Sequence, residues 1–468
     1  MKKRKIWPWL ALACLVAPMF ASYYFDDMFS TLSHIFREPG LLRLGWSSAD
    51  YGIYAGAYSF LCVFGGLVVG GLLLDMYGVR KMGTFFVALM VGGAALVTFA
   101  LRSGLSPKAS LSVAYIGKML FGLGSEIAGV AVTRSIAKWF KSGGMALAMG
   151  LQLAIARLGT AFAFIIAPLF IAGHIEGEVY SLAETSRPAM LGMGLLLAGA
   201  LLWLLFLGLD AAFDARRRKE ALSQAGKLGS PSLTNGYLDR SGGPSEGGGD
   251  PEKFQFSDIG KMLANKQFIM LALLCVFFYC CIVSFKKFGT AIVIPRFGME
   301  VESAKWVITM IPFFTVIFTP LFGALVDKAG GAPRWMLLGS LMVLAAHLII
   351  GFAPSGQPFF GYAGIALLGT GYSLVPSAMW PTVPKIVPEK NLGTAYSLIY
   401  WVQNLGMLLV PLIVGSIFSS TLGEVPDDAL AAKAAVRAEM VFTALGLLAV
   451  AVALLFLRSA KKEPRSAF

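Results

Sequence analysis

The sequence predicts an all-α membrane protein with twelve transmembrane helices in two halves of six. Three observations support this fold class: the composition, a series of long apolar runs, and a short motif that occurs once in each half. Of the 468 residues, 57% are hydrophobic and 14% are charged, and the mean hydropathy is +0.72. Soluble domains carry about 25% charged residues, so this composition indicates a protein embedded in lipid.

Twelve apolar runs are long enough to cross about 30 Å of hydrocarbon, which takes roughly 20 helical residues. They lie at 7–36, 50–77, 83–103, 109–138, 144–173, 187–213, 266–295, 303–326, 334–353, 358–384, 392–420 and 434–458. Basic residues such as Arg80, Lys138 and Lys385 follow every second run, so the positive-inside rule predicts that both termini are cytoplasmic. The first run begins like a signal peptide but meets no convincing cleavage site, and we expect it to be retained as a spanning helix.

Residues 220–256 interrupt the apolar pattern with glycine, serine, proline and charge. Such a segment cannot bury enough apolar surface to order itself, which predicts a flexible cytoplasmic linker. It separates an N-terminal six-helix bundle (1–219) from a C-terminal six-helix bundle (257–468). The net charge of +13 comes from short basic segments between apolar runs, so it reflects topology and predicts no nucleic-acid partner. All five cysteines lie inside predicted helices and no histidines have ligand spacing, so neither disulfides nor a metal site are expected.

The motif G-x-L-x-D-x-x-G occurs at the cytoplasmic end of the second predicted helix of each half. Its positions are Gly71, Asp75 and Gly78 in the first copy and Gly323, Asp327 and Gly330 in the second. The copies are 327 − 75 = 252 residues apart, about half the chain. Glycine permits close helix approach, and the aspartate can cap a helix end or pair with nearby Arg80. Arg134 is a further gating candidate, because it could snorkel to the surface or close a gate against a carboxylate such as Asp75.

Twelve helices divided six and six, a long central linker and this duplicated motif resemble the major facilitator superfamily. The resemblance implies two pseudo-symmetric bundles that rock about a central site near the membrane midplane. It also implies that Asp75 and Asp327 belong to cytoplasmic networks that stabilise the outward-open state.

Longer patterns are more specific. The segments AVTRSIAKWFK, GLQLAIARLGTAFAF and YSLVPSAMWPTVPKIVPEKNLGTAYSLIYWVQNLG are similar to the lysosomal dipeptide uniporter branch of that superfamily and its prokaryotic relatives. In that branch a glutamate on the fourth helix and an arginine on the fifth help to hold the charged ends of the peptide. The residue-by-residue match implies a substrate site formed by Glu126, Arg157, Trp380, Tyr396 and Gln403.

The residues also carry an interpretation of their own. Glu126 and Arg157 lie near the middle of predicted helices, where charge is costly and snorkelling is poor. They are either an interhelical ion pair that fixes the bundle or the two poles of a zwitterion site. We favour the second, because intramembrane charges usually face a cavity. In that interpretation Glu126 binds the ammonium group and Arg157 the carboxylate.

The tenth and eleventh predicted helices supply further candidates. Prolines surround Trp380 and predict a broken tenth helix, which in transporters points to the transport path. Tyr396 and Gln403 share one face of the eleventh helix, where they and Asn404 could pack against a neighbouring helix or contact a ligand.

Two pairs of adjacent charges leave alternatives open. Lys286 and Lys287 lie in the seventh predicted helix, and a cavity-facing lysine there would favour a more anionic ligand. The alternative function is therefore an organic-anion (dicarboxylate) carrier or antiporter, in which Arg157 and one lysine bind two carboxylates. Asp26 and Asp27 lie in the outer half of the first helix and could carry a proton. We favour simple hydration at a protruding helix end, which leaves uniport and proton symport both open.

These features predict a transporter that works by alternating access on a small polar solute, with dipeptides or related zwitterions as the favoured class. An enzyme is not expected, because the sequence has no phosphate-binding loop, no HExxH and no plausible triad. No cofactor is expected, and the partners are the substrate and the lipid bilayer, with the monomer as the functional unit. The sequence lacks an acidic dileucine signal and an N-x-[ST] sequon, so a bacterial inner (cytoplasmic) membrane suits it better than a lysosome.

Overall fold

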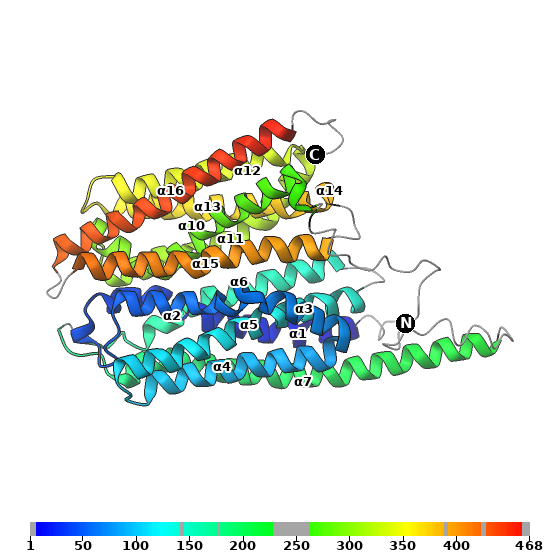
Figure 1. Cartoon of the computed structure of the whole chain (residues 1–468). Helices are drawn as coiled ribbons and strands as arrows, with labels where there is room; N and C mark the ends of the chain where they lie inside the picture. Colours follow the sequence, from blue (N-terminus) through cyan, green and yellow to red (C-terminus); the bar gives the residue numbers. More distant parts are fainter. Residues whose placement is uncertain are drawn as a thin grey trace.

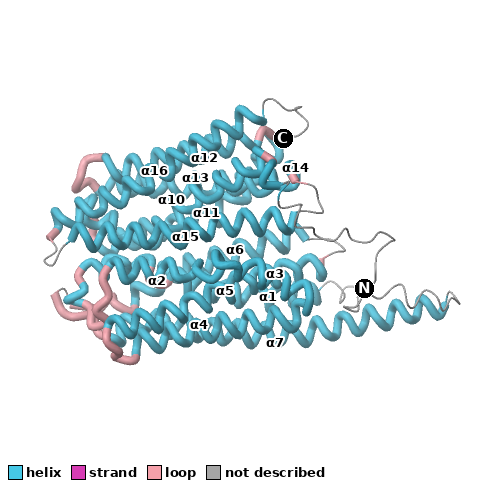
Figure 2. Tube along the Cα trace, in the orientation of Figure 1, coloured by secondary structure: helices cyan, strands magenta, loops and turns pink. Residues whose placement is uncertain are grey.

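The protein is a stack of roughly parallel helices (Figure 1). Its structure, a computed structural model, describes residues 6–140, 145–175, 177–227, 260, 262–387, 392–422 and 427–460. Within these ranges twelve helical segments are long and apolar enough to cross a membrane, and Figure 2 shows loops joining helices with no strand among the described residues. The predicted all-α, multi-pass membrane fold is confirmed.

Six crossing segments form the N-terminal half. They are α1 (Ile6–Asp27) with the 3₁₀ segment η2 (Ser30–Arg37), α2 (Ser48–Leu61) continued by α3 (Leu67–Gly78), α4 (Thr84–Arg102), α5 (Pro107–Trp139), α6 (Met145–Leu169) and α7 (Leu182–Lys227). Helix α7 continues past Glu220 into the segment expected to be linker, because RRRKEALSQAGK is rich in good helix formers. The rest of the predicted linker, 228–256, lies outside the described residues.

The second crossing segment is interrupted where the sequence predicts one continuous helix. The backbone leaves helical geometry at Phe64 (ψ 35°) and Gly65 (φ 94°), and Gly65 takes this positive φ without a Cβ clash. The break frees backbone carbonyls that need new partners inside a membrane. Trp401 supplies one from the other half, with Nε1 donating to the Val63 carbonyl oxygen at 2.7 Å.

The C-terminal half repeats this arrangement. It contains α10 (Lys266–Phe297), α11 (Val301–Ala329), α12 (Ala332–Phe352), α13 (Pro358–Met379), the 3₁₀ turn η6 (Trp380–Thr382), α14 (Val383–Ile386), α15 (Leu392–Leu422) and α16 (Asp428–Ala460). At Trp380 the tenth crossing segment passes into a 3₁₀ turn, but the residue keeps helical dihedral angles (φ −62°, ψ −42°). The break expected from the surrounding prolines, which lack a backbone N–H, is therefore limited to this change of helix type.

The main helix contacts in the two halves correspond to one another. Helix α1 packs on α6 and α7, and α10 packs on α15 and α16; α4 packs on α5 and α7, and α12 packs on α13 and α16. Across the interface, α2 packs on α15 and α6 packs on α11. These two contacts are equivalent, because each joins the second crossing segment of one half to the fifth crossing segment of the other. The duplication indicated by the sequence motif is therefore present in the packing as two pseudo-symmetric bundles.

We call the side on which α1 begins and α16 ends the terminal side, at the right of Figure 1, and the other the opposite side. Close contacts between the halves gather near the opposite side, where α2 begins and α15 ends. The Ala49 N–H donates to Ser419 Oγ at 2.9 Å. One helical turn deeper, Gly52 lies so close to the Pro411 carbonyl that a Cβ would collide with it. Backbone contact of this kind closes the interface tightly at this side.

Candidate substrate site

Glu126 lies on α5, half-buried, and its carboxylate is held by a tyrosine of α2. The Tyr58 hydroxyl donates to Glu126 Oε1 at 3.0 Å. Tyr58 also contacts Ser125 Oγ at 3.3 Å, and Ser125 in turn hydrogen-bonds Ser22 of α1. Because these hydroxyls belong to three different helices, they fix the position of the carboxylate relative to the bundle.

Arg157 lies on α6 with its guanidinium between aromatic rings of both halves. The guanidinium carbon is 5.8 Å from the ring centre of Tyr23 on α1 and 5.2 Å from that of Tyr372 on α13. Among the described residues no ion pair joins Arg157 to Glu126 or to another carboxylate. Tyr23 lies within electrostatic reach of both charged groups. The structure thus brings Glu126 and Arg157 to one neighbourhood and leaves them without direct contact.

The C-terminal half faces these charges with an aromatic wall made of Tyr279, Tyr372, Trp380, Tyr396 and Tyr400. Tyr372 and Tyr279 meet edge to face at 5.9 Å, and Trp380 Nε1 donates to the Tyr279 hydroxyl at 2.9 Å. Trp380 stacks on Tyr400 at 5.2 Å and lies 5.9 Å from Tyr396. Trp380 and Tyr396 were predicted site residues; the other three tyrosines were missed, although the i, i+4 spacing of Tyr396 and Tyr400 places them on one helical face.

Gln403 and Asn404 make contacts within the C-terminal half. Gln403 Oε1 accepts a long contact from Cys275 Sγ of α10 at 3.5 Å. Asn404 is buried and donates to the Tyr400 carbonyl of its own helix at 3.0 Å. Gln403 thus contacts a neighbouring helix and Asn404 bonds within its own helix, while ligand contact by either amide stays a prediction.

A five-charge cluster lies between the halves, made of Asp26, Asp27, Lys118, Lys286 and Lys287. Lys286 Nζ is 2.6 Å from Asp27 Oδ2, and Lys287 Nζ is 2.9 Å from Asp26 Oδ2. Lys118 of α5 binds the other oxygen of Asp26 at 2.8 Å. The two lysines of α10 thus hold the two aspartates of α1 across the interface.

The burial of this cluster overturns one expectation. The Asp27 side chain is 2% exposed and Lys118 is fully buried, so hydration at a protruding helix end does not explain the acid pair. Beyond its lysine partner, Asp27 accepts a hydrogen bond from Thr160 of α6 at 2.8 Å. Charges buried this deeply persist only when they are paired, and here the pairing depends on the two halves being together.

The duplicated glycine motif differs from its predicted role. No atom lies within 4 Å of a Cβ built at Gly71 or Gly323, so neither mediates a close helix approach here. Gly78 and Gly330 instead turn the chain with positive φ values of 79° and 65°. Asp327 is exposed and has no described hydrogen bond or ion pair, and the side chain of Asp75 lies outside the described residues.

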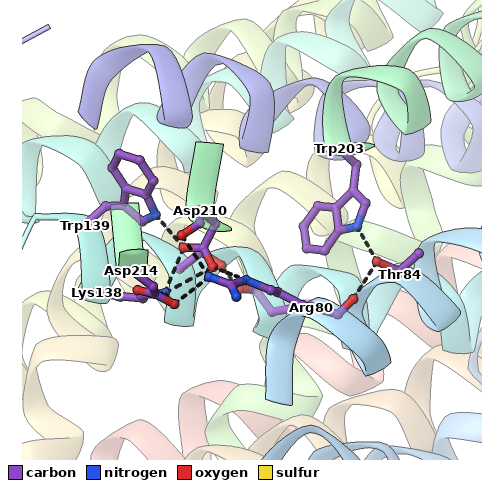
Figure 3. Close-up of polar contacts among 9 residues, drawn as sticks. Arg80, Thr84, Lys138, Trp139, Trp203, Asp210 and Asp214 are labelled. Carbon is purple, nitrogen blue, oxygen red and sulfur yellow. Dashed lines mark hydrogen bonds and ion pairs between the residues drawn. The ribbon is translucent and has the colours of Figure 1, made fainter. Parts of the chain in front are cut away.

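Arg80 belongs to an ionic network on the terminal side whose described partners lie on α7 (Figure 3). Its predicted pairing with Asp75 stays a prediction. Its Nε is 2.8 Å from Asp210 Oδ2, and its Nη2 is 2.5 Å from Asp214 Oδ2, both on α7. Lys138 at the end of α5 also binds Asp210 at 2.8 Å, and Trp139 Nε1 donates to the same carboxylate at 2.9 Å. The network joins three segments of the N-terminal half, and among the described residues it has no partner in the other half.

Arg134 lies one turn before this network on α5, with an exposed side chain. Its predicted pairing with Asp75 stays a prediction, because the Asp75 side chain lies outside the described residues.

Comparison with known families agrees with this architecture. The sequence matches the Major Facilitator Superfamily over residues 10–411 and 280–468. The chain belongs to this superfamily. It is therefore a transporter rather than an enzyme. A zebrafish (Danio rerio) protein named lysosomal dipeptide transporter MFSD1 is 27% identical over 405 residues, which cover 85% of this chain and 78% of the relative.

Solved structures resemble the chain in fold. A bacterial homologue of the human lysosomal transporter Spinster, in an inward-facing conformation, aligns with a TM-score of 0.66 over 97% of this chain and 98% of its own, at 14% identity. The nucleoside transporter NupG aligns with a TM-score of 0.65 over 96% and 99%, at 12% identity. At such identities these structures support the fold and leave the substrate to the residues of the site.

Proposed function

We propose that this transporter moves dipeptides and related small zwitterions by alternating access. One observation carries the proposal: Glu126 and Arg157, of opposite charge, lie on either side of one turn of α1 and do not pair with each other. Ser22 of this turn hydrogen-bonds Ser125 beside Glu126, and the ring of Tyr23 contacts Arg157. A zwitterion would satisfy both, with its ammonium group on Glu126 and its carboxylate on the Arg157 guanidinium, whose planar fork suits bidentate binding. The similarity to proteins named dipeptide transporters supports the same class.

The aromatic wall suits the remainder of such a substrate. Ligand sites are mostly apolar, with a few polar groups that fix orientation. Here Arg157 of the N-terminal half contacts the wall, while Tyr372 and Tyr400 offer ring faces and hydroxyls and Trp380 offers the face of its indole. Ring faces accept side chains of many shapes, so we expect recognition to depend on the two backbone charges and to tolerate varied side chains.

The five-charge cluster serves as the gate on the opposite side. With Asp27 bound to Lys286 and α2 against α15, that side is closed, and opening it requires the aspartates and lysines to separate and hydrate. We take the terminal side as cytoplasmic, following the basic segments there, so the conformation described is closed to the outside. The protein would work as a monomer in a bacterial inner membrane. Asp26 and Asp27 are the groups at which proton coupling would occur.

The alternative of a dicarboxylate carrier requires Lys286 or Lys287 to bind substrate. Both lysines already have aspartate partners at 2.6 and 2.9 Å, so a second carboxylate would compete with the gate. This favours the zwitterion.

The test is ligand-induced thermal stabilisation of the purified protein, which rises with RT ln(1 + [L]/Kd). The ligand series is a dipeptide, its N-acetyl derivative and its C-terminal amide. We expect the wild type to prefer the unmodified peptide. Glu126→Gln should weaken binding at least tenfold, because a hydrogen bond to a charged group contributes about 1.5–3 kcal/mol, and it should remove the preference over the acetylated form.

The complementary variant, Arg157→Lys, keeps the charge and loses the fork geometry. It should weaken binding of the free acid more than that of the amide, and leave discrimination against the acetylated peptide intact. If both variants lose all ligands equally, or if neither changes the preferences, the assignment of one pole to each residue is wrong.

A further inference from the structure

An open groove runs between α4 and α7 on the membrane-facing surface of the N-terminal half, near the opposite side. Its volume is about 640 Å³, and its lining is mostly apolar. Its lining comes from two helices that pack together (Figure 1). The residues are Ala95, Thr98, Phe99 and Arg102 on α4, Ser103 directly after it, and Met190, Met193, Gly194 and Leu197 on α7.

The depth of the groove follows from helix geometry. At its first residue, α4 adjoins the ionic network of the terminal side, because Thr84 Oγ1 donates to the Arg80 carbonyl at 2.6 Å. The helix has 19 residues, which at 1.5 Å per residue span about 28 Å, close to one hydrocarbon thickness. Arg102, the last residue of α4, therefore reaches the lipid headgroups of the other leaflet. The groove descends from Arg102 to Ala95, about 10 Å into the acyl region.

Arg102 lacks an anionic partner. Its side chain is exposed. Among the described residues, the only hydrogen-bond partner of its guanidinium is the Met190 sulfur, 3.0 Å from Nη1. Its position also departs from the positive-inside rule, which disfavours arginine on this side. Another arginine on this side, Arg37, does have an acidic partner, with its Nη2 3.9 Å from Asp428 Oδ1. Arg102 presents a cation at headgroup level, directly above an apolar groove.

We propose that this groove is a binding site for one glycerophospholipid. The Arg102 guanidinium binds the phosphate through paired N–H donors, and an acyl chain lies along Phe99, Met193 and Leu197. A phospholipid is the occupant whose chemistry matches both parts, because it carries an anion at headgroup depth and a hydrocarbon chain below it. Gly194 contributes by leaving the floor open, since no atom lies within 4 Å of a Cβ built there.

The test is lipid binding to delipidated, detergent-purified protein, measured by native mass spectrometry during titration with phosphatidylglycerol, phosphatidylethanolamine or phosphatidylcholine. We expect one lipid to bind more tightly than the rest. Arg102→Gln should weaken that first binding step about tenfold for every headgroup that carries the phosphate diester. The matched control is Lys108→Gln, which removes an exposed cation near the same side, at the start of α5 and outside the groove, and should leave the first step unchanged.

A second variant tests the groove and keeps Arg102. Gly194→Leu places a side chain into the open floor and should weaken the same step by competing with the acyl chain, while inorganic phosphate should not displace the lipid from the wild type. Equal first-step affinities in wild type, Arg102→Gln and Gly194→Leu would overturn the proposal. So would an effect of Lys108→Gln as large as that of Arg102→Gln, since binding would then reflect general surface charge, or protection of the groove by a protein partner with no bound lipid.

Discussion

Replacing Lys286 by glutamine should open the side opposite the termini. Lys286 Nζ is 2.6 Å from Asp27 Oδ2, and the two side chains are 6% and 2% exposed. Removing one partner of a buried ion pair costs about 3–5 kcal/mol, because the remaining charge stays desolvated. Asp27 keeps its bond from Thr160 and a contact with Lys287 at 3.7 Å, so the lower end, about 3 kcal/mol, applies.

This penalty falls mainly on the closed conformation, because opening lets water reach Asp27. At 1.4 kcal/mol per decade, the equilibrium should shift toward the open form by about 100-fold. Ser33 is a suitable reporter, since it is buried and its Oγ lies 2.9 Å from Thr290 Oγ1 across the interface. With the native cysteines replaced, Ser33→Cys in liposomes should react with an impermeant maleimide up to about 100 times faster in the Lys286→Gln background.

Lys305→Gln is the matched control. It also removes a lysine charge, but its described partner, Glu302, lies on the same helix at 3.6 Å and is 65% exposed. It should leave the labelling rate unchanged, because this described pair lies within one helix and does not join the two halves. Exchanging the charges, with Asp27→Lys and Lys286→Asp together, should restore part of the slow rate. Equal labelling in wild type and Lys286→Gln would refute the gate.

Two further predictions concern positioning and stability. Tyr58→Phe removes the hydrogen bond to Glu126 and should weaken dipeptide binding, measured by thermal stabilisation, about tenfold. The control Tyr54→Phe should not weaken binding, because the buried Tyr54 hydroxyl has no described partner. Equal affinities in the two variants would contradict the positioning role of Tyr58. Asp210→Asn should destabilise the N-terminal half by about 3 kcal/mol, because it weakens a buried carboxylate's bonds to two cations and an indole. Unfolding midpoints in detergent should fall for this variant but not for the exposed control Asp327→Asn, and equal midpoints would refute the network's structural role.

Much of the fold could be predicted because the membrane imposes it. Apolar length gives the crossing segments, and the missing N–H groups of the prolines account for the 3₁₀ turn at Trp380. The kink at Gly65 could not be predicted, since glycine is abundant throughout this chain and nothing in the sequence marks this one for a positive φ inside a crossing segment. The helical extension of α7 was missed for a related reason: composition indicated solvent exposure, and solvent exposure does not forbid a helix.

The partners of the site charges were harder to predict than the charges themselves. Asp26 and Asp27 were interpreted as a hydrated helix end because local sequence gives no view of the other half. The repeat carried a usable signal: Lys286 and Lys287 lie on the equivalent helix of the second half, at 286 − 26 = 260 residues, near the motif offset of 252. Helices at equivalent places can meet at the pseudo-symmetric interface, so adjacent acids on one and adjacent lysines on the other could have been paired.

The central claim is that this chain carries zwitterions between the poles Glu126 and Arg157. Uptake into proteoliposomes containing the purified full chain tests it most directly, with radiolabelled dipeptide and dicarboxylate compared in wild type and Glu126→Gln. The account predicts saturable dipeptide flux in the wild type, strongly reduced in Glu126→Gln, and no dicarboxylate flux in either. Saturable dicarboxylate flux without flux of any dipeptide would contradict it.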